Sequence, residues 1–290
     1  MATLSDTVEY VFALAGTKLV GMLSPRGADR FAAGLGQLVY RLYGSRRRVA
    51  LDNLRQALGE QHSGAELEDI ARDVFQSISR SLIEMARFPV TSRERLDRIV
   101  VGPDKRVIDE ALARGNGAMV CTAHFGNWEM LGAWFAVQGY PMDLLVGVQH
   151  NAGVDRLLTS FRRAMGVDVI PAQTAARQVI RSLRANHLVG IAGDQHTGSG
   201  LPIDFFGRRA LAARGPAMFA VKSGAPMLPF LMRRESYDRH VFITGDPIYP
   251  PENDDSEQAV DDMTRRYHRF LEDHIRRCPG QWMWTHRRWK

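Results

Sequence analysis

Two different patterns of apolar and polar positions divide the chain near residue 115. Up to that point apolar residues recur every three or four positions, the spacing that places them on one face of a helix. Beyond it, short apolar runs alternate with segments of helical spacing. Such alternation is typical of an α/β protein in which helices cover a largely parallel sheet. We therefore expect one integrated fold, with an N-terminal helical region at 1–115 and an α/β core at 116–290.

Local signals mark where several helices should begin and end. Ser24 is followed by Pro25, which suits a cap with proline at the first helical position, and Ser63–Glu66 is a capping box. Gly44 is expected to end the helix that Pro25 opens, and Phe88-Pro89 to break the helix that Ser63 opens. Further helices are expected near 127–139, 153–165, 174–186, 213–224 and 256–277.

Five apolar runs in the second part of the chain predict buried strands. They are "GAMVCTA", "MDLLVGVQ", "LVGIAGD", "PMLPFLM" and "RHVFITG". In open α/β sheets, ligands bind outside the carboxyl ends of the strands. Polar residues follow three of the runs, namely His124, Asp194 and the pair Gln149-His150. These strand ends are therefore expected to converge on one crevice.

The stretch from Val8 to Leu23 is the most lipid-like part of the N-terminal region. Its apolar residues fall at helical spacing, but it contains Glu9 and Lys18 and is short of the roughly 20 apolar residues that cross a bilayer. No cleavable signal peptide is evident before it. The pattern predicts an amphipathic helix that either packs on the domain or lies in a membrane interface.

The charge balance concerns the partners of the chain more than its fold. There are 38 Lys and Arg residues against 32 Asp and Glu, and the isoelectric point is about 9.6. A basic balance suits nucleic acid, an anionic membrane surface, or an acidic protein or substrate. No nucleic-acid-binding module is recognisable, so nucleic acid is not expected as a partner. The tryptophans beside the basic C-terminal cluster Thr285–Lys290 suit either a membrane interface or a buried anchor.

The two cysteines indicate a reducing compartment. Cys121 and Cys278 form neither a CxxC motif nor a metal-binding spacing. Cys121 lies within an apolar run, which favours a core thiol over a nucleophile.

The segment "CTAHFGNWEML" holds the strongest candidate for catalysis. His124 and Glu129 are five residues apart, so on an unbroken helix they would be separated by about 140°. Gly126 and Asn127 supply a turn and a helix cap, which would let Glu129 accept a hydrogen bond from one imidazole nitrogen. The other nitrogen would then take a proton from a hydroxyl group. The alternative is a structural histidine with Glu129 complementing the helix dipole; a second histidine for zinc is missing, so no metal is expected.

The decamer "AHFGNWEMLG" closely resembles the active-site motif of the late acyltransferases of lipid A biosynthesis. That family contains lauroyl and myristoyl transferases and the phosphatidylinositol mannoside acyltransferases. Further blocks resemble the family in the same order over residues 35–290: "RRRVALDNLRQALGE", "GVQHNAGVDRLLTSFRRAMG", the segment 189–234 and "QWMWTHRRWK". The resemblance implies a glycerolipid-acyltransferase-like fold and transfer of a fatty acyl group from a thioester to a glycolipid hydroxyl.

The resemblance also implies roles for particular residues. His124 would be the general base and Glu129 its orienting partner. Arg162 is the best match to an arginine that serves the site in the family, with Arg163 as the alternative; both also suit a solvated helix face. Asn127 is expected to contact substrate in addition to capping its helix.

Two further residues are expected to bind substrate. Asp194 suits a substrate contact or a structural carboxylate, and equally a cap on the turn after its strand. Arg208 suits the phosphate of an anionic lipid or an acidic carrier, and equally an ordinary surface charge. Two positions depart from the family and change the charge near the expected acceptor site: relatives commonly have Arg at the position of His150 and Asp at the position of His196.

Together these features predict a membrane-associated O-acyltransferase at the cytoplasmic face of the inner membrane. The expected donor is acyl carrier protein or coenzyme A carrying the acyl thioester, and no cofactor is expected. The expected acceptor is an anionic glycolipid, either a lipid A precursor or another lipid such as a phosphatidylinositol mannoside. A non-catalytic membrane-binding or carrier-binding protein is the alternative of a different class.

Overall fold

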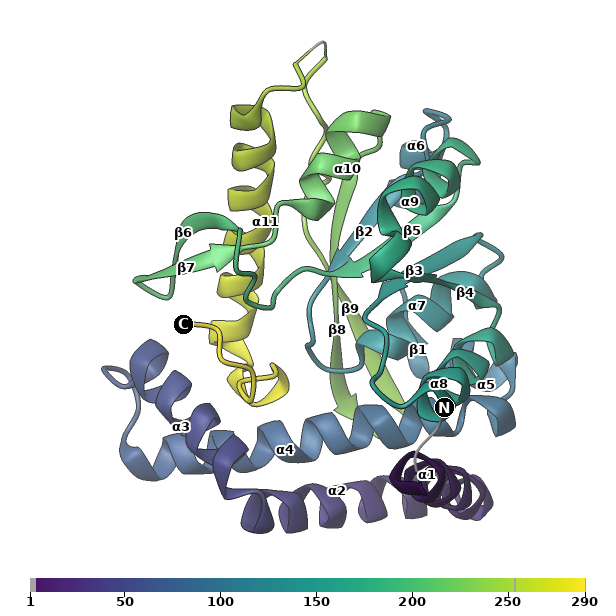
Figure 1. Ribbon diagram of the computed structural model, residues 1–290, viewed down its shortest axis with the longest axis vertical. Coiled ribbons are helices and arrows are strands. Elements are labelled where there is room, and N and C mark those ends of the chain that lie inside the picture. Colours follow the sequence, from purple (N-terminus) through teal and green to yellow (C-terminus); the bar gives the residue numbers. More distant parts are fainter. Residues whose placement is uncertain (1–3, 253, 290) are drawn as a thin grey trace.

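A computed structural model describes residues 4–252 and 254–289, and a twisted sheet of seven strands runs through its centre (Figure 1). The strand order is β1-β9-β8-β2-β5-β3-β4, and β8 with β9 is the antiparallel pair in an otherwise parallel sheet. The strands are β1 (Val100–Val101), β2 (Ala118–Thr122), β3 (Met142–Val146), β4 (Val167–Pro171), β5 (Leu188–Ala192), β8 (Met227–Ser236) and β9 (Arg239–Thr244). A separate antiparallel hairpin joins β6 (Leu201–Phe205) to β7 (Arg208–Ala212).

The central strand β2 shows why the sheet needs helices on both faces. All five of its residues are buried. Met119 and Cys121 point into one hydrophobic cluster, whereas Ala118 and Val120 point into the other. A parallel strand covered on both sides reads as a continuous apolar run because neither set of side chains can face water.

Helices cover the two faces of the sheet unequally. One face carries α5 (Arg93–Ile99), α6 (Lys105–Leu112), α7 (Trp128–Val137) and α8 (Ala152–Ala164). The other carries α9 (Ala175–Arg184), α10 (Gly215–Ser223) and α11 (Glu257–Arg277). Figure 1 shows α11 standing between the sheet and the β6–β7 hairpin.

The N-terminal helices form a platform at one end of the sheet (Figure 1). They are α1 (Leu4–Met22), α2 (Pro25–Leu42), α3 (Gly44–Leu58) and α4 (Gly64–Ala86), followed by the 3-10 turn η1 (Phe88–Val90). The longest of them, α4, lies between α2 and the sheet. Gly36 lets α2 approach α4 closely, since a Cβ at this position would lie 2.6 Å from the backbone of Gln76.

The amphipathic N-terminal helix predicted from sequence is present as α1. It packs on α8 and α4, and Val20 is buried. Several of its large apolar side chains nevertheless face outward: Phe12 is 74% and Met22 84% exposed, and Val8, Val11 and Leu19 are also exposed. Within the described residues, no helix combines the length and the apolar character needed to span a bilayer.

Most element predictions are confirmed. All five apolar runs form strands, Ser24 caps α2, and the capping box at Ser63–Glu66 opens α4. One boundary is wrong, because Gly44 begins α3 whereas α2 already ends at Leu42. The sequence did not reveal β4, whose exposed Asp168 interrupts the apolar run, or the short strand β1 inside the region expected to be helical. The division at residue 115 stays a prediction.

Candidate active site

A tight turn after β2 places His124. Gly126 has φ +54, and a Cβ there would lie 1.8 Å from the carbonyl oxygen of Met232, so conformation and space both require glycine. The Gly126 N–H donates to the Gln281 carbonyl, and its own carbonyl accepts from the Ser81 hydroxyl. The Asn127 N–H donates to Met232. Three distant segments therefore hold the turn that carries the histidine.

Asp194 is the carboxylate that orients the imidazole. His124 Nδ1 lies 2.8 Å from Asp194 Oδ1, and the His124 backbone N–H donates to Oδ2 at 3.1 Å. A carboxylate at Nδ1 makes that nitrogen the donor, so the lone pair is left on Nε2. The His124 side chain is 22% exposed, whereas Asp194 is 2% exposed. The histidine therefore presents an accessible base whose partner is shielded from water.

Strand register explains this pairing. In the parallel ladder Thr122 of β2 lies opposite Ala192 of β5, and His124 and Asp194 each follow two residues later. The prediction that polar strand ends converge is therefore confirmed for these two residues. The prediction that Glu129 accepts the hydrogen bond from His124 is not matched by the structure, which gives that place to Asp194.

Electrostatics of the pair favour an ionised carboxylate and a more basic imidazole. Burial works against the charged form of His124, but the neighbouring Asp194 charge and hydrogen bond outweigh it and raise the pKa of His124. Burial likewise opposes ionisation of Asp194, yet His124, the Trp282 indole and the His124 backbone N–H together lower the pKa of Asp194 to about 2. Asp194 is therefore an anion throughout the neutral range.

The C-terminal segment packs against the buried side of the site, where Asp194 lies. Trp282 is 3% exposed, and its indole N–H donates to Asp194 Oδ2 at 2.8 Å. Trp282 also forms a bridge with Phe125, and the Met283 N–H donates to the His124 carbonyl at 3.0 Å. Of the two interpretations of the C-terminal tryptophans, Trp282 therefore follows the buried anchor. Its hydrogen bond to Asp194, the partner of the candidate base, was not predicted.

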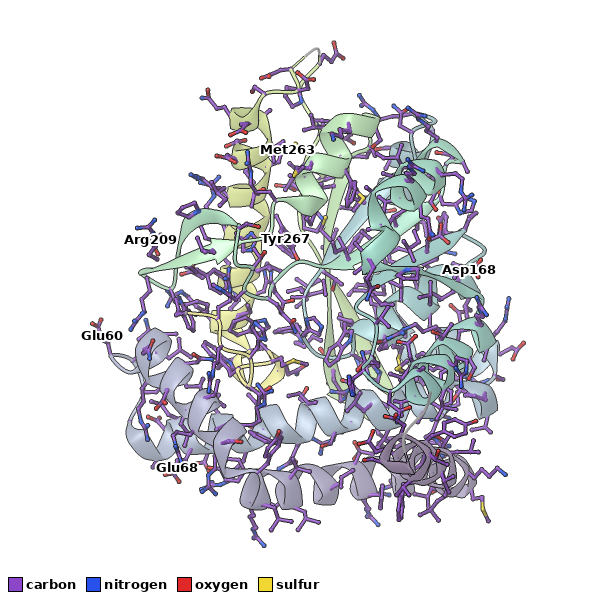
Figure 2. The ribbon with its side chains drawn as sticks, in the orientation of Figure 1. Glu60, Glu68, Asp168, Arg209, Met263 and Tyr267 are labelled. Atoms are coloured by element: carbon purple, nitrogen blue, oxygen red, sulfur yellow. The ribbon has the colours of Figure 1, made fainter. Side chains whose placement is uncertain are left out.

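Tyr267 of α11 joins the ends of the two strands that carry the pair. Its hydroxyl donates to the Thr122 carbonyl and accepts from the Gly193 N–H. Figure 2 shows Tyr267 on the inner side of α11, and the side chain is 1% exposed. The hydroxyl therefore fixes the spacing between the segments that precede His124 and Asp194.

Glu129 forms a different ion pair beside the histidine. Arg162 of α8 binds it with two hydrogen bonds, from Nε at 2.9 Å and from Nη2 at 2.7 Å, and both side chains are largely buried. The Glu129 charge also contributes to raising the pKa of His124. The structure thus brings Arg162 into the site, as expected, but as the partner of Glu129. Arg163, the alternative, is exposed.

Asn127 has a structural position. It is 0% exposed, its Oδ1 accepts from the Met130 N–H at 2.9 Å, and its Nδ2 donates to Glu84. Its predicted role as the cap of α7 is confirmed. With both polar atoms occupied inside the protein, it has no surface for the substrate contact that was expected of it.

The remaining predicted residues lie apart from the pair. Arg208 begins β7 in the separate hairpin and is exposed. His150 is exposed on the loop after β3, so the third strand end does not join His124 and Asp194 among the described contacts. His196 lies nearer, and its backbone N–H donates to His286 Nε2 at 3.2 Å. Cys121 is fully buried, and burial raises the pKa of its thiol, which confirms a core position.

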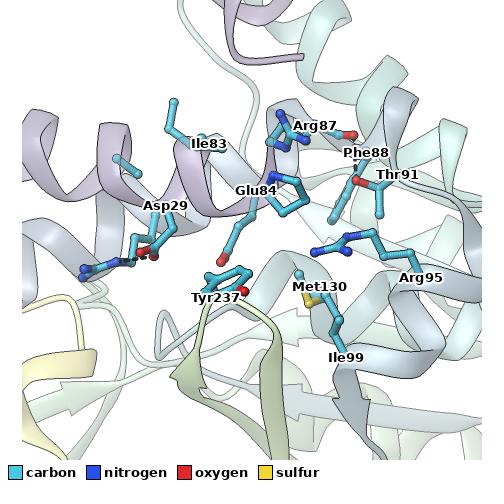
Figure 3. A pocket seen from close by; sticks show the side chains of 14 residues that line it. Asp29, Ile83, Glu84, Arg87, Phe88, Thr91, Arg95, Ile99, Met130 and Tyr237 are labelled. Carbon is cyan, nitrogen blue, oxygen red and sulfur yellow. Dashed lines mark hydrogen bonds and ion pairs between the residues drawn. The ribbon is translucent and has the colours of Figure 1, made fainter. Parts of the chain in front are cut away.

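A small cavity lies beyond Asn127, between α2, α4 and the turn of the β8–β9 hairpin (Figure 3). Glu84, Arg87, Arg95 and Tyr237 are among its lining residues. Its volume is about 40 Å³, room for a few water molecules, so it cannot hold a fatty chain.

A histidine–aspartate pair at the ends of parallel strands suits an enzyme that activates the hydroxyl of a second substrate. Residues 2–290 match the family described as bacterial lipid A biosynthesis acyltransferase, and the chain belongs to this family.

The curated relatives carry names of two kinds, phosphatidylinositol mannoside acyltransferases and lipid A acyltransferases. A phosphatidylinositol mannoside acyltransferase of Mycobacterium tuberculosis is 29% identical over 163 residues, which cover 53% of this chain and 51%, about half, of the relative. The lipid A palmitoleoyltransferase of Escherichia coli is 28% identical over 84% of this chain and 79% of its own length. The lauroyltransferase of the same organism is 26% identical over 90% and 84%.

Proposed function

We propose that this protein transfers a fatty acyl group from an acyl thioester to a hydroxyl group of a lipid A precursor. The observation that carries the proposal is the His124–Asp194 pair at 2.8 Å, in a chain that belongs to this acyltransferase family. Acyl carrier protein or coenzyme A supplies the thioester. The basic surface of the chain suits either donor, because both are anionic.

His124 acts as the general base in this proposal. Nε2 accepts the proton of the lipid hydroxyl as its oxygen attacks the thioester carbonyl carbon. The tetrahedral intermediate then collapses, the C–S bond breaks, and the imidazolium returns the proton to the thiolate. An ester and a free thiol result. Asp194 holds the His124 ring in the tautomer that carries its proton on Nδ1, and it stabilises the imidazolium. The buried pair of Glu129 and Arg162 supports the first turn of α7, which follows the His124 turn.

The apolar surface of α1 supports membrane association. Phe12 and Met22 are the most exposed of its large apolar side chains, and Phe31 and Leu42 of α2 are exposed as well. Exposed apolar side chains on neighbouring helices mark a surface that is covered in use. We place the enzyme at the cytoplasmic face of the inner membrane, where both thioester donors and lipid precursors are available.

A second acceptor class also has support. Phosphatidylinositol mannoside acyltransferases are among the curated relatives, so a mannosylated phospholipid is the alternative acceptor. Mass spectrometry of lipids after gene deletion separates the two: a lipid A species that lacks one secondary acyl chain supports the first, and unchanged lipid A excludes it.

The test of the chemistry uses purified protein, acyl thioesters of several lengths and a panel of glycolipid acceptors. We expect His124→Gln to lower kcat about 10²- to 10⁴-fold, the usual contribution of general base catalysis. His187→Gln is the matched control, since His187 also pairs with an aspartate, Asp143, away from the site. Undiminished transfer by His124→Gln would refute the assignment.

A further inference from the structure

Two hollows meet at the end of α2. The first is an apolar groove of about 320 Å³ between α2 and α4, with Val39 and Ile78 among its walls. The second is a polar hollow of about 440 Å³ between the start of α3 and the C-terminal segment, lined by Arg287 and His286. Tyr43 and Arg46 line both. A molecule that occupied both would have a hydrocarbon part and a polar part.

The polar hollow is cationic. Among the described residues, no Asp or Glu lines either hollow, and no carboxylate lies within ion-pair distance of Arg46 or Arg287. Arg46 donates to the backbone carbonyl of Thr285, at 3.3 Å, and no carboxylate of residues 4–252 or 254–289 neutralises its charge. Guanidinium groups bind phosphate and carboxylate through paired N–H donors. The polar hollow therefore favours an anionic group.

The groove, in contrast, is almost entirely aliphatic and aromatic. Leu35 and Val39 of α2 face Phe75, Ile78 and Leu82 of α4 across it. Leu82 is 50% exposed, so the groove is open to the surface at this residue. Contact between these apolar walls and water is unfavourable in free energy. One hydrocarbon chain lying between the helices would remove the walls from water.

Both hollows are connected to the candidate base by a well-anchored segment. Asn53 of α3 donates to the carbonyls of Trp284 and His286, at 2.8 and 2.7 Å. His286 accepts from the His196 N–H, two residues beyond Asp194, while Met283 donates to the His124 carbonyl. The residues that line the polar hollow are thus held in fixed relation to the catalytic pair.

We infer that these hollows bind the lipid acceptor: its anionic group lies between Arg46 and Arg287, and one of its acyl chains lies along the groove between α2 and α4. The inference rests on the proposed acyl transfer and adds the site that selects an anionic lipid. The segment that lines the polar hollow also contacts the His124 turn and the residues after Asp194, which ties the bound acceptor to the catalytic pair.

Binding is tested with two detergents that share a dodecyl chain, below their critical micelle concentrations. Dodecyl phosphate should bind in calorimetry and compete with the lipid acceptor but not with the thioester, whereas dodecyl maltoside should bind at least about tenfold more weakly, a difference of 1.4 kcal/mol. Inorganic phosphate should not compete, which excludes a site for the free anion. Equal binding of both detergents, or competition with the thioester, would overturn the inference; the latter would assign the hollows to the acyl donor or its carrier.

Kinetics of charge and groove variants provide the second test. Arg46→Glu with Arg287→Glu should raise KM for the acceptor about 10- to 100-fold while KM for the thioester stays constant. Arg177→Glu on α9 makes the same charge reversal at an exposed position away from the hollows. It should leave the KM for the acceptor and the KM for the thioester unchanged. Leu82→Glu should also raise the acceptor KM, with exposed Met218→Glu as its control.

The outcome is separable from that of the proposed function. If the Arg46 and Arg287 variant transfers acyl groups with wild-type acceptor KM, the binding site is wrong and the chemistry stands. If His124→Gln retains full activity, the chemistry itself is wrong.

Discussion

At the scale of single residues, the orientation of one imidazole depends on three donors that converge on Asp194. The His124 ring, the His124 backbone N–H and the Trp282 indole all point at its carboxylate. A carboxylate so buried is anionic only because these groups replace water. Substitutions of Asp194 should therefore change the pKa and the orientation of the His124 ring.

The first prediction concerns the pH dependence of kcat. Asp194 raises the pKa of His124, so the wild-type base becomes neutral only above its ordinary value near 6.5. Asp194→Asn removes the larger of the two charges that raise that pKa and leaves burial opposed only by the more weakly acting Glu129, so the pKa of His124 falls. The acidic limb of the pH–kcat profile should move to lower pH, while kcat at its plateau falls about 100-fold or more because the tautomer is no longer held. An unmoved limb would show that Asp194 does not set the basicity of His124.

The second prediction concerns Trp282. Trp282→Phe keeps an aromatic ring against Phe205 and Trp284 but loses the hydrogen bond to Asp194. One hydrogen bond to a charged group is worth about 1.5 kcal/mol, so kcat should fall about tenfold with both KM values unchanged. Trp284→Phe, which loses a bond to the Pro279 carbonyl instead, should retain kcat. Equal losses in the two variants would mean that only packing matters.

The site could be predicted from sequence only in part. His124 was recognisable because it follows a buried apolar run and precedes a turn. Its partner was not, because the spacing of Glu129 along the chain suggested a local pairing, whereas the true neighbour is set by the register of β2 and β5. The role of Trp282 was harder still to predict, because no local sequence pattern indicates which turn the C-terminal segment will contact.

At the scale of elements, Glu84 ties three of them together. It lies on α4, its carboxylate binds Arg234 of β8, and it accepts from Asn127 at the start of α7. Both Glu84 and Arg234 have little exposed surface. The platform of N-terminal helices is therefore joined to the active-site turn through a buried ion pair.

The third prediction follows from that junction. Glu84→Gln leaves the Arg234 charge buried without its partner and should lower the free energy of unfolding by about 3–5 kcal/mol. Exposed Glu60→Gln on the loop after α3 should change it by less than about 0.5 kcal/mol. Urea denaturation followed by circular dichroism measures both. A loss near that of Glu60→Gln would mean that α4 is held by its apolar contacts alone.

The fourth prediction concerns α1. Phe12→Ser with Met22→Ser removes the two most exposed apolar side chains of the helix and should weaken binding to anionic vesicles about tenfold or more, since each loses about 1.5–3 kcal/mol of apolar transfer. Co-sedimentation with phosphatidylglycerol vesicles measures this. Because neither side chain packs inside the protein, the thermal midpoint should stay constant. Unchanged sedimentation would place the membrane contact elsewhere.

Element predictions succeeded where burial is uniform and failed where it is mixed. The strand β2 is apolar throughout because it is covered on both faces, and its sequence shows this directly. The edge strand β4 carries exposed Asp168, so its apolar run is too short to recognise. Gly44 was misread because two helices follow each other almost without a loop at Tyr43.

At the scale of the whole molecule, two buried carboxylates make stability depend on acid. The pKa values of Glu84 and Asp194 are both about 2, below ordinary values of 4.5 and 3.8. The unfolded chain therefore binds protons first as pH falls, and the stability that each group adds is complete above about pH 4.5 and lost on the way to pH 2.

The fifth prediction is a steep acid limb of the thermal midpoint. Each group contributes about 2–3 kcal/mol that should disappear between about pH 4.5 and pH 2, and His268, buried neutral with a pKa of about 4, adds to the loss as pH falls below about 6.5. Calorimetry across that range should show the midpoint falling. The fall should be shallower in Asp194→Asn than in wild type; parallel curves would contradict the assigned linkage.

The contacts of residues 281–283 with the His124 turn also bear on the timing of synthesis. A ribosome produces His124 and Asp194 long before it reaches the segment that braces them. A nascent chain that stopped before residue 281 would hold both reactive groups without the brace, so the imidazole would be less firmly oriented toward a thioester. These contacts can form only once residues 281–283 have left the exit tunnel.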